Sequence, residues 1–404
     1  MHSNSLYDAL ERMAQYGTAP EEVCSLFGVG LDDPLARLKK VYFDNAFSRG
    51  RSAEKFVVGP FGSGKTHFLR QLQEVAYRSD CAVAEVQLNR DVDFTDPLAV
   101  YQEIAAEIQV PDQPTKGLQS LLRHAAERLR DSADNEQMGN GLLLHFSLET
   151  AERVFELECL GRMYARAFQA QLDGETEHFE LVCRWLAGGF GDRSICKFLG
   201  VAPISKPEHR RYGHKAALSL YQLIKSLGYT GTLVCLDEAE QSLDVDRKRM
   251  QTVLSTLQSG INAAADLKDG AVLIVFAITP DVADKLKEFP ALQQRLVDPG
   301  PGMGFFEGKN TRTPLIDLSE RQEKIEEELL HIATNLVKLY ADSIDSDLKD
   351  LQPLHEKCSA IAVDVASSEV GSSIRRTLTK QVCCAILSYD DGDWAATPAQ
   401  EDEV

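Results

Sequence analysis

The chain has 404 residues, of which 44% are hydrophobic and 26% charged, a balance that suits a soluble protein with one large core or two domains. No apolar run approaches the roughly 18 residues of a membrane-spanning helix, and the polar N-terminal residues predict no signal peptide. The formal net charge of −19 repels a phosphate backbone, so the composition does not favour non-specific DNA binding.

The nine cysteines are scattered and form no CxxC pair, which predicts reduced, mostly buried thiols in a cytoplasmic protein with no membrane contact. A basic cluster at residues 206–215 has two interpretations, a solvated surface or a nucleic-acid contact. DNA contact therefore stays open, although the net charge does not support it.

The first half of the chain begins with short predicted helices over residues 1–50. A buried strand is predicted at 55–59, where it runs into a glycine turn, and a second strand at 81–88. Asp96 and Pro97 are typical of a helix start. Residues 111–230 are mostly helical by pattern, with apolar stripes at 118–129 and 154–168 and a helix end at Leu227–Gly228.

Strand signals return at 232–236 and 271–278, and more weakly at 313–318. Continuous apolar strands between helices predict a parallel sheet covered on both faces. Ser319 and Gln322 form a predicted capping box, and a further helix is predicted through 374–386. We therefore expect these consecutive parts: an N-terminal helical segment (1–50), a core (51–318) with a helical insert (111–230), a helical lid (319–388) and an acidic disordered tail (389–404).

A glycine-rich loop follows the first predicted strand and fits the pattern G-x-x-x-x-G-K-[ST] without departure. Its residues are Gly59, Pro60, Phe61, Gly62, Ser63, Gly64, Lys65 and Thr66. Such a loop wraps backbone N–H groups around phosphate oxygens, the lysine reaches the β- and γ-phosphates, and the threonine hydroxyl binds Mg²⁺. The helix that starts near His67 points its positive N-terminus at the phosphates. ATP and Mg²⁺ are therefore the predicted ligands, and no guanine-reading motif follows.

Two acids, Asp237 and Glu238, end the strand at 232–236. Acids at this place hold the magnesium of a P-loop fold, so Asp237 is the predicted metal residue and Glu238 the general base. Glu240 is a competing candidate for the base. The alternative interpretation is a strand-end turn with ordinary surface acids.

Four further residues are candidates for the same site. Thr279 ends the strand at 271–278 and could sense the γ-phosphate. Arg295 could act on a neighbouring subunit's nucleotide as an arginine finger. Arg375 and Arg376 could contact the nucleotide from the lid. For each arginine, a solvated or ion-paired surface residue is the alternative.

The run from Val58 to Arg70 resembles the P-loop of the BREX-system P-loop ATPases, the BrxC/BrxD-type ATP-binding proteins of bacterial phage exclusion. Arg184–Gly188 resembles that family's tryptophan–leucine signature, 228–240 its Walker B segment, and 291–298 its finger region. The similarity covers roughly residues 35–390, and the length suits the short BrxD-like form.

This resemblance implies an α/β fold: a P-loop NTPase (AAA+/ASCE-like) three-layer core with a parallel sheet of order 5-1-4-3-2, a large helical insert and a C-terminal helical lid. It also implies nucleotide sites completed by neighbouring subunits, hence a homo-oligomer, and other defence-system proteins as partners. We expect a Mg-dependent ATPase with a regulatory or remodelling role in anti-phage defence, and partner contacts on the insert. The alternatives are a nucleotide-gated binding module with little turnover and a DNA translocase subunit.

Overall fold

The computed structural model describes residues 3–17, 24–88, 92, 96–239, 258–260, 262–288, 292–293, 302–320, 325–368 and 374–392. The chain divides into two compact units. Unit 1 combines Met1–Pro34, Gly59–Glu74 and Leu318–Val404, and unit 2 combines Leu35–Val58 and Val75–Asp317. The consecutive parts expected from the sequence stay a prediction, because a division by spatial contacts does not test which parts fold alone.

Unit 2 is built on a five-stranded sheet with the order β2-β3-β4-β1-β5. All neighbouring strands are parallel, and counted from the β5 edge the order is 5-1-4-3-2. The strands are β1 (Ala53–Val58), β2 (Cys81–Gln87), β3 (Gly231–Asp237), β4 (Val272–Ile278) and β5 (Leu315–Asp317). β3 is buried along its whole length, as expected for a strand covered on both faces.

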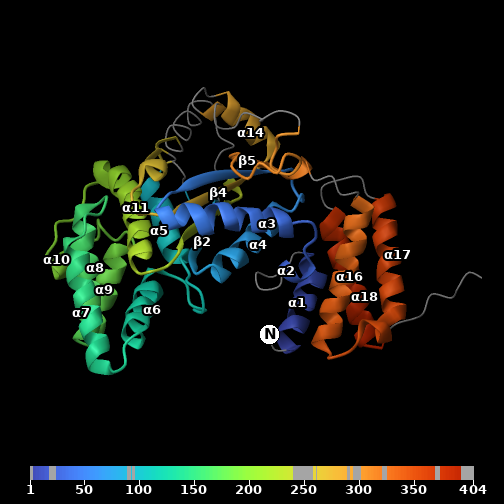
Figure 1. Cartoon of the computed structure of the whole chain (residues 1–404), viewed down its shortest axis with the longest axis horizontal. Coiled ribbons are helices and arrows are strands. Elements are labelled where there is room, and N and C mark those ends of the chain that lie inside the picture. Colours follow the sequence, from blue (N-terminus) through green and yellow to red (C-terminus); the bar gives the residue numbers. More distant parts are fainter. Residues whose placement is uncertain are drawn as a thin grey trace, which may run out of the picture. The chain divides into compact units, whose positions relative to one another are not determined.

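The chain leads into β1 through α3 (Asp32–Leu38), the π-helical η1 (Lys39–Ala46) and the short η2 (Phe47–Arg49). One face of the sheet is covered by α5 (Pro97–Glu107) and α11 (His209–Ser226), as Figure 1 shows. The predicted start of α5 is confirmed, because the Asp96 carboxylate accepts a hydrogen bond from the Leu98 N–H at 3.0 Å. α14 (Pro280–Lys287) follows β4.

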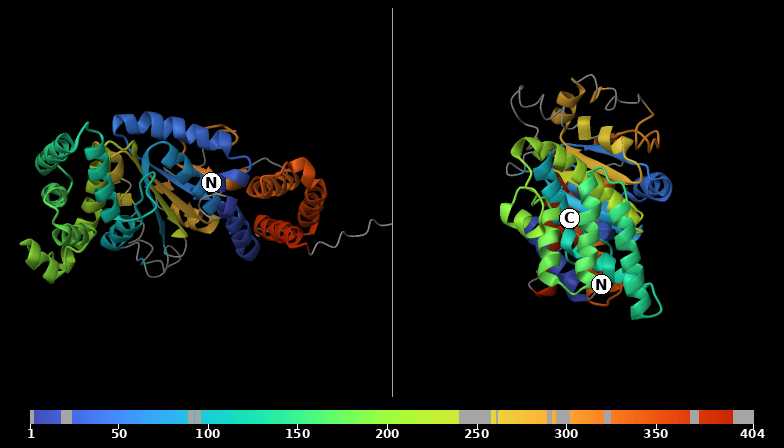
Figure 2. Two further views of the ribbon diagram at one scale, coloured as in Figure 1. Left: turned by 90° about the horizontal axis from the view of Figure 1, so that it is seen from below. Right: turned by 90° about the vertical axis from the view of Figure 1, so that its left-hand side faces the viewer.

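The predicted insert is helical throughout most of its length. Its further helices are α6 (Leu118–Asp131), α7 (Glu136–Glu152), α8 (Glu158–Leu172), α9 (Thr176–Leu186), α10 (Arg193–Leu199) and the short η3 (Lys206–Glu208). α6 to α9 pack side by side, in green in the right-hand view of Figure 2. The stripe expected at 154–168 starts too early, because Val154 is 83% exposed and the helix begins only at Glu158.

Unit 1 has a separate apolar core. α1 (Ser3–Tyr16) packs against α16 (Ile325–Ser343) and α18 (Ile374–Asp390), and α17 (Gln352–Ser368) completes the group. Shorter elements are α2 (Cys24–Phe27), η4 (Leu318–Glu320) and η5 (Leu348–Leu351). α18 continues to Asp390, past residue 389 where the sequence predicted the tail to begin.

Tyr7 of α1 and Tyr340 of α16 both contact the last residue of α18. Both phenols donate hydrogen bonds to the Asp390 carboxylate, at 2.9 Å and 2.6 Å. Within the described parts of the chain, no helix has the length and apolar character needed to cross a membrane.

Candidate functional site

The glycine-rich loop begins at the residue after β1 and ends in the first turn of α4 (Lys65–Arg78). Gly62 and Gly64 have φ angles of 78° and 93°, in the region that favours glycine. A Cβ atom at Gly59 would lie 2.2 Å from Ser63 Oγ, so a larger residue there would require the Ser63 side chain to move. Two of the loop's three glycines therefore have backbone angles that other residues rarely adopt, and phosphate binding by the loop stays a prediction.

Lys65 lies across its own loop. Its ammonium group donates to the carbonyl oxygens of Gly59 at 2.9 Å and Pro60 at 3.4 Å, and lies 5.2 Å from the centre of the Phe61 ring. The lysine is buried, whereas Phe61 is 66% exposed. In the described part of the structure, the ammonium group of Lys65 therefore contacts only neutral groups of its own loop.

Thr66 and His67 follow in the first turn of α4. His67 Nε2 lies 2.8 Å from Gln71 Nε2, and the same amide nitrogen donates to the Cys24 carbonyl at 3.1 Å. The His67 ring therefore helps to connect α4 to α2 within unit 1. A direct contact between His67 and a nucleotide stays a prediction.

The two acids at the end of β3 differ in burial. Asp237 is the last residue of the strand and is 3% exposed, and its Oδ1 accepts a hydrogen bond from the Glu238 N–H at 2.9 Å. Glu238 is exposed and has a φ angle of 54°. A left-handed backbone is uncommon for glutamate, and such strained residues cluster at functional sites. The sequence identified both acids but not this conformation.

Thr279 lies directly after β4 and before Pro280, the first residue of α14. It is 3% exposed, and its backbone oxygen accepts the Ala283 N–H at 3.0 Å. Its side chain makes no capping hydrogen bond to the helix that it precedes. Val58 and Ile278, the last residues of β1 and β4, are partners in the sheet register. The strand-end position predicted for Thr279 is thus the observed one, and its role stays a prediction.

The two lid arginines make contacts inside unit 1. Arg375 forms a bidentate ion pair with Glu328, with nitrogen–oxygen distances of 2.9 Å and 2.6 Å, and the Glu328 side chain is 4% exposed. Arg376 Nε donates to the Tyr16 carbonyl at 2.9 Å. Their contact with a nucleotide stays a prediction. Arg295 and Glu240 lie outside the described residues.

Lys55 is a buried residue of β1 that lies a few positions before the loop. The sequence predicted that it is part of a strand but predicted no other role for it. It is 1% exposed, and its ammonium donates to the carbonyl oxygens of Thr311 and Thr313 and lies over the Tyr42 ring. Burial lowers the pKa of Lys55 to about 7. A lysine that directly precedes the apolar run Phe56–Val58 was the signal that could have identified it.

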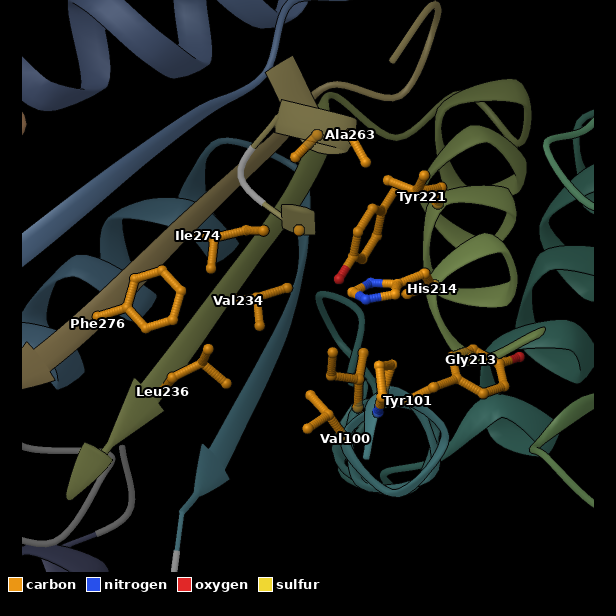
Figure 3. A pocket seen from close by; sticks show the side chains of 16 residues that line it. Val100, Tyr101, Gly213, His214, Tyr221, Val234, Leu236, Ala263, Ile274 and Phe276 are labelled. Atoms are coloured by element: carbon orange, nitrogen blue, oxygen red, sulfur yellow. The ribbon is translucent and has the colours of Figure 1, made fainter. Parts of the chain in front are cut away.

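A hollow of about 100 Å³ lies between the sheet and the helices α5 and α11. In Figure 3, His214 and Tyr221 of α11 point toward one another and toward Val234 of β3. Burial, together with the nearby charge of Arg210, lowers the pKa of His214. The remaining lining is largely apolar; it includes none of the predicted site residues, although Leu236, which directly precedes Asp237 in β3, is part of it.

No group of three or more His, Cys, Asp or Glu side chains among the described residues is placed to hold a metal ion. Hard oxygen donors are nevertheless available in Thr66 and Asp237. Magnesium takes only one or two such protein ligands when phosphates and water complete its shell. Each of these oxygen donors taken alone suits Mg²⁺, and their common role in one metal site stays a prediction.

A comparison with protein families identifies one family whose model covers nearly the whole chain. The family model described as BREX system ATP-binding protein BrxC/D matches residues 3–387. No curated protein matches the chain, and no solved structure matches it. The family match includes the glycine-rich loop, both strand-end acids and nearly all of α18.

Proposed function

The chain belongs to the BREX system ATP-binding protein BrxC/D family, and from this premise we propose that it binds ATP at residues 59–66 and hydrolyses it with magnesium. The observation that carries the proposal is the end of β3, where buried Asp237 precedes a glutamate in a left-handed conformation. A nucleotide store without turnover has no need for a strained, exposed carboxylate at this place.

The loop and α4 supply the binding energy for the phosphates. Backbone N–H groups and the N-terminus of α4 favour negative charge. Lys65 now donates to two neutral carbonyl oxygens, Gly59 and Pro60. A phosphate oxygen forms a stronger, charge-assisted bond with an ammonium group. We therefore expect Lys65 to exchange these carbonyl partners for the β- and γ-phosphates when ATP binds.

Thr66 and Asp237 are the residues that would hold magnesium. The ion supplies positive charge that stabilises the phosphate oxygens. Glu238 accepts a proton from the attacking water, whose oxygen forms the bond to the γ-phosphorus while the bond to the β–γ bridging oxygen breaks, giving ADP and phosphate. Thr279 orients this water. Arg295 from a neighbouring subunit, with Arg375 and Arg376, stabilises the developing charge.

At the level of the cell, we propose a cytoplasmic AAA+-like protein that forms a homo-oligomer and acts on other proteins of the defence system. The family description supports an ATP-binding protein within BREX. The parallel sheet supports a P-loop NTPase fold, because its carboxyl ends place the residues after neighbouring strands at one edge.

The test is steady-state ATP hydrolysis across a protein-concentration series, with ATP binding measured in parallel, for the wild type, Glu238→Gln and the exposed control Glu177→Gln. We expect turnover per chain to rise with concentration, to fall by at least about 100-fold in Glu238→Gln, and to be unchanged in the control, while all three bind ATP. Tight binding without turnover in the wild type would instead support a nucleotide-gated module. Stimulation by duplex DNA that falls steeply with salt would support a translocase.

A further inference from the structure

α7 is apolar on the face that packs inward and also on the face that points to solvent. Leu143 and Phe146 are buried in the core of unit 2. Four large apolar side chains on the same helix are exposed: Met138 by 54%, Leu142 by 43%, Leu144 by 43% and Leu148 by 60%. We call these four residues the α7 outer face.

The α7 outer face lies on one side of the helix, where its four apolar side chains share the surface with the exposed polar residues His145 and Glu149. At 3.6 residues per turn, its members fall within an arc of about 160° around the helix. Single exposed leucines are normal on a protein surface, but four large apolar side chains gathered on one side of one helix are typical of a surface that binds another protein. From Met138 to Leu148 the strip is about 15 Å long, which is the length of roughly three helical turns.

Acidic side chains outnumber basic ones at both ends of the strip. Before it lie Asp131, Asp134 and Glu136, and after it Glu149, Glu152 and Glu156, all of them exposed. Arg153 is the single lysine or arginine between residues 131 and 158. His145 lies within the strip, and its Nε2 atom is 3.5 Å from the Glu149 carboxylate. The surface is therefore an apolar band between acidic ends.

We propose that the α7 outer face binds an amphipathic helix of a partner protein, one with an apolar stripe of about three turns and lysine or arginine residues at both ends. Helix-on-helix packing buries such stripes against one another, and basic ends match the acidic ends of α7. A second copy of this chain fits poorly, because pairing two such faces brings like charges together. This interaction surface goes beyond the proposed ATPase activity and does not rest on it.

The probe is a labelled synthetic peptide of 17 residues, the length of α7, with leucines on one face and lysines at both ends. Its binding to the full chain is followed by fluorescence anisotropy. We expect saturable binding that weakens with salt and falls by at least about 10-fold in Leu142→Glu and in Leu148→Glu. The matched control is Val363→Glu, at a residue of α17 that is 53% exposed, which leaves binding unchanged.

A second peptide with glutamates in place of the lysines separates charge recognition from general apolar adhesion, and we expect it not to bind. The proposal is overturned by absent binding of the basic peptide, by equal binding of the acidic one, or by α7 variants that fold normally and bind as the wild type does. Sedimentation of the protein alone, in which a dimer is dissociated by Leu148→Glu, would overturn it in favour of a second copy. Repeating the titration with Lys65→Met keeps the outcome independent of ATP hydrolysis.

Discussion

Lys55 is a buried base whose charge depends on pH near neutrality. Its ordinary pKa of 10.5 falls to about 7 because burial disfavours the charged ammonium. Between these two values the unfolded chain holds a proton that the folded chain releases. The contribution of Lys55 to stability therefore rises with pH above about 7, and is complete only above the unfolded pKa.

We expect the contribution of Lys55 to the free energy of unfolding of the wild type to increase by about 1 kcal/mol per pH unit above pH 7. Lys55→Met removes the titrating group and flattens this part of the profile. The exposed control Lys349→Met leaves it unchanged. Denaturant unfolding at pH 7, 8 and 9 measures all three proteins, and equal slopes for the wild type and Lys55→Met would contradict the assignment.

At this scale the sequence predicted which residues form the loop and the strand end, because their identities follow from phosphate and metal chemistry. It could not predict the present partners of those residues. The Lys65 contacts depend on the curvature of the loop, and the left-handed angle of Glu238 accompanies a hydrogen bond from its own N–H to Asp237 that no sequence pattern indicates. The partner of Arg375 is Glu328, which lies in another helix and has no local sequence signal.

Among the elements, α5 and α11 approach one another closely at Gly213. A Cβ atom added there would lie 2.3 Å from the Leu98 nitrogen and from the Pro97 carbonyl carbon. These are backbone atoms at the capped start of α5, so they cannot move aside without breaking the cap. Gly213 therefore allows α11 to cross the beginning of α5.

We expect Gly213→Ala to lower the free energy of unfolding by about 1–3 kcal/mol through overpacking. Gly141→Ala is a matched control, because Gly141 is also inside a helix and its added Cβ would meet nothing within 4 Å. This control should raise stability by up to about 1 kcal/mol. Chemical denaturation compares the variants, and an equal effect of both would mean that the close crossing is unimportant.

The central strands β3 and β4 were predictable because most of their residues form continuous apolar runs. α7 was not resolved as a separate helix, since side chains on both of its faces are apolar and the helical period is hidden. α17 was missed for another reason. Its buried stripe includes Cys358 and Ala362, which give a weak hydrophobic signal.

On the scale of the whole molecule, Asp390 connects helices that are distant in sequence. It accepts hydrogen bonds from Tyr7 in α1 and Tyr340 in α16. Its hydrogen bond and negative charge raise the pKa of Tyr7 to about 12. The carboxylate therefore joins the first and the last described helices of unit 1.

We expect Asp390→Asn to increase hydrogen exchange in α1, α16 and the end of α18, and to leave β1–β4 of unit 2 unchanged. Lost stability should be about 1–2 kcal/mol for the unit. Exchange that rises equally in the strands of unit 2 would contradict a local role. Tyr7→Phe, which removes one of the two donors, should have a smaller effect in the same helices.

Local sequence patterns could not predict which helices pack together to form unit 1. Periodicity identifies helices and strands, but it does not say that α1 packs with α16 and α18. That pairing depends on matching apolar faces, in which Leu10 and Met13 of α1 share a core with Leu336 and Leu378.

Unit 1 combines segments from both ends of the chain, and this has a consequence for synthesis on the ribosome. About 310 residues separate the end of α1 at Tyr16 from the start of α16 at Ile325. At a translation rate of roughly 5–20 residues per second, on the order of 15–60 s pass between the synthesis of α1 and that of the helices that it packs against. All of Leu35–Val58 and Val75–Asp317 has been translated by then. A stop codon before Ile325 would therefore release a chain in which unit 2 is complete. The glycine-rich loop belongs to unit 1, which would lack its C-terminal helices.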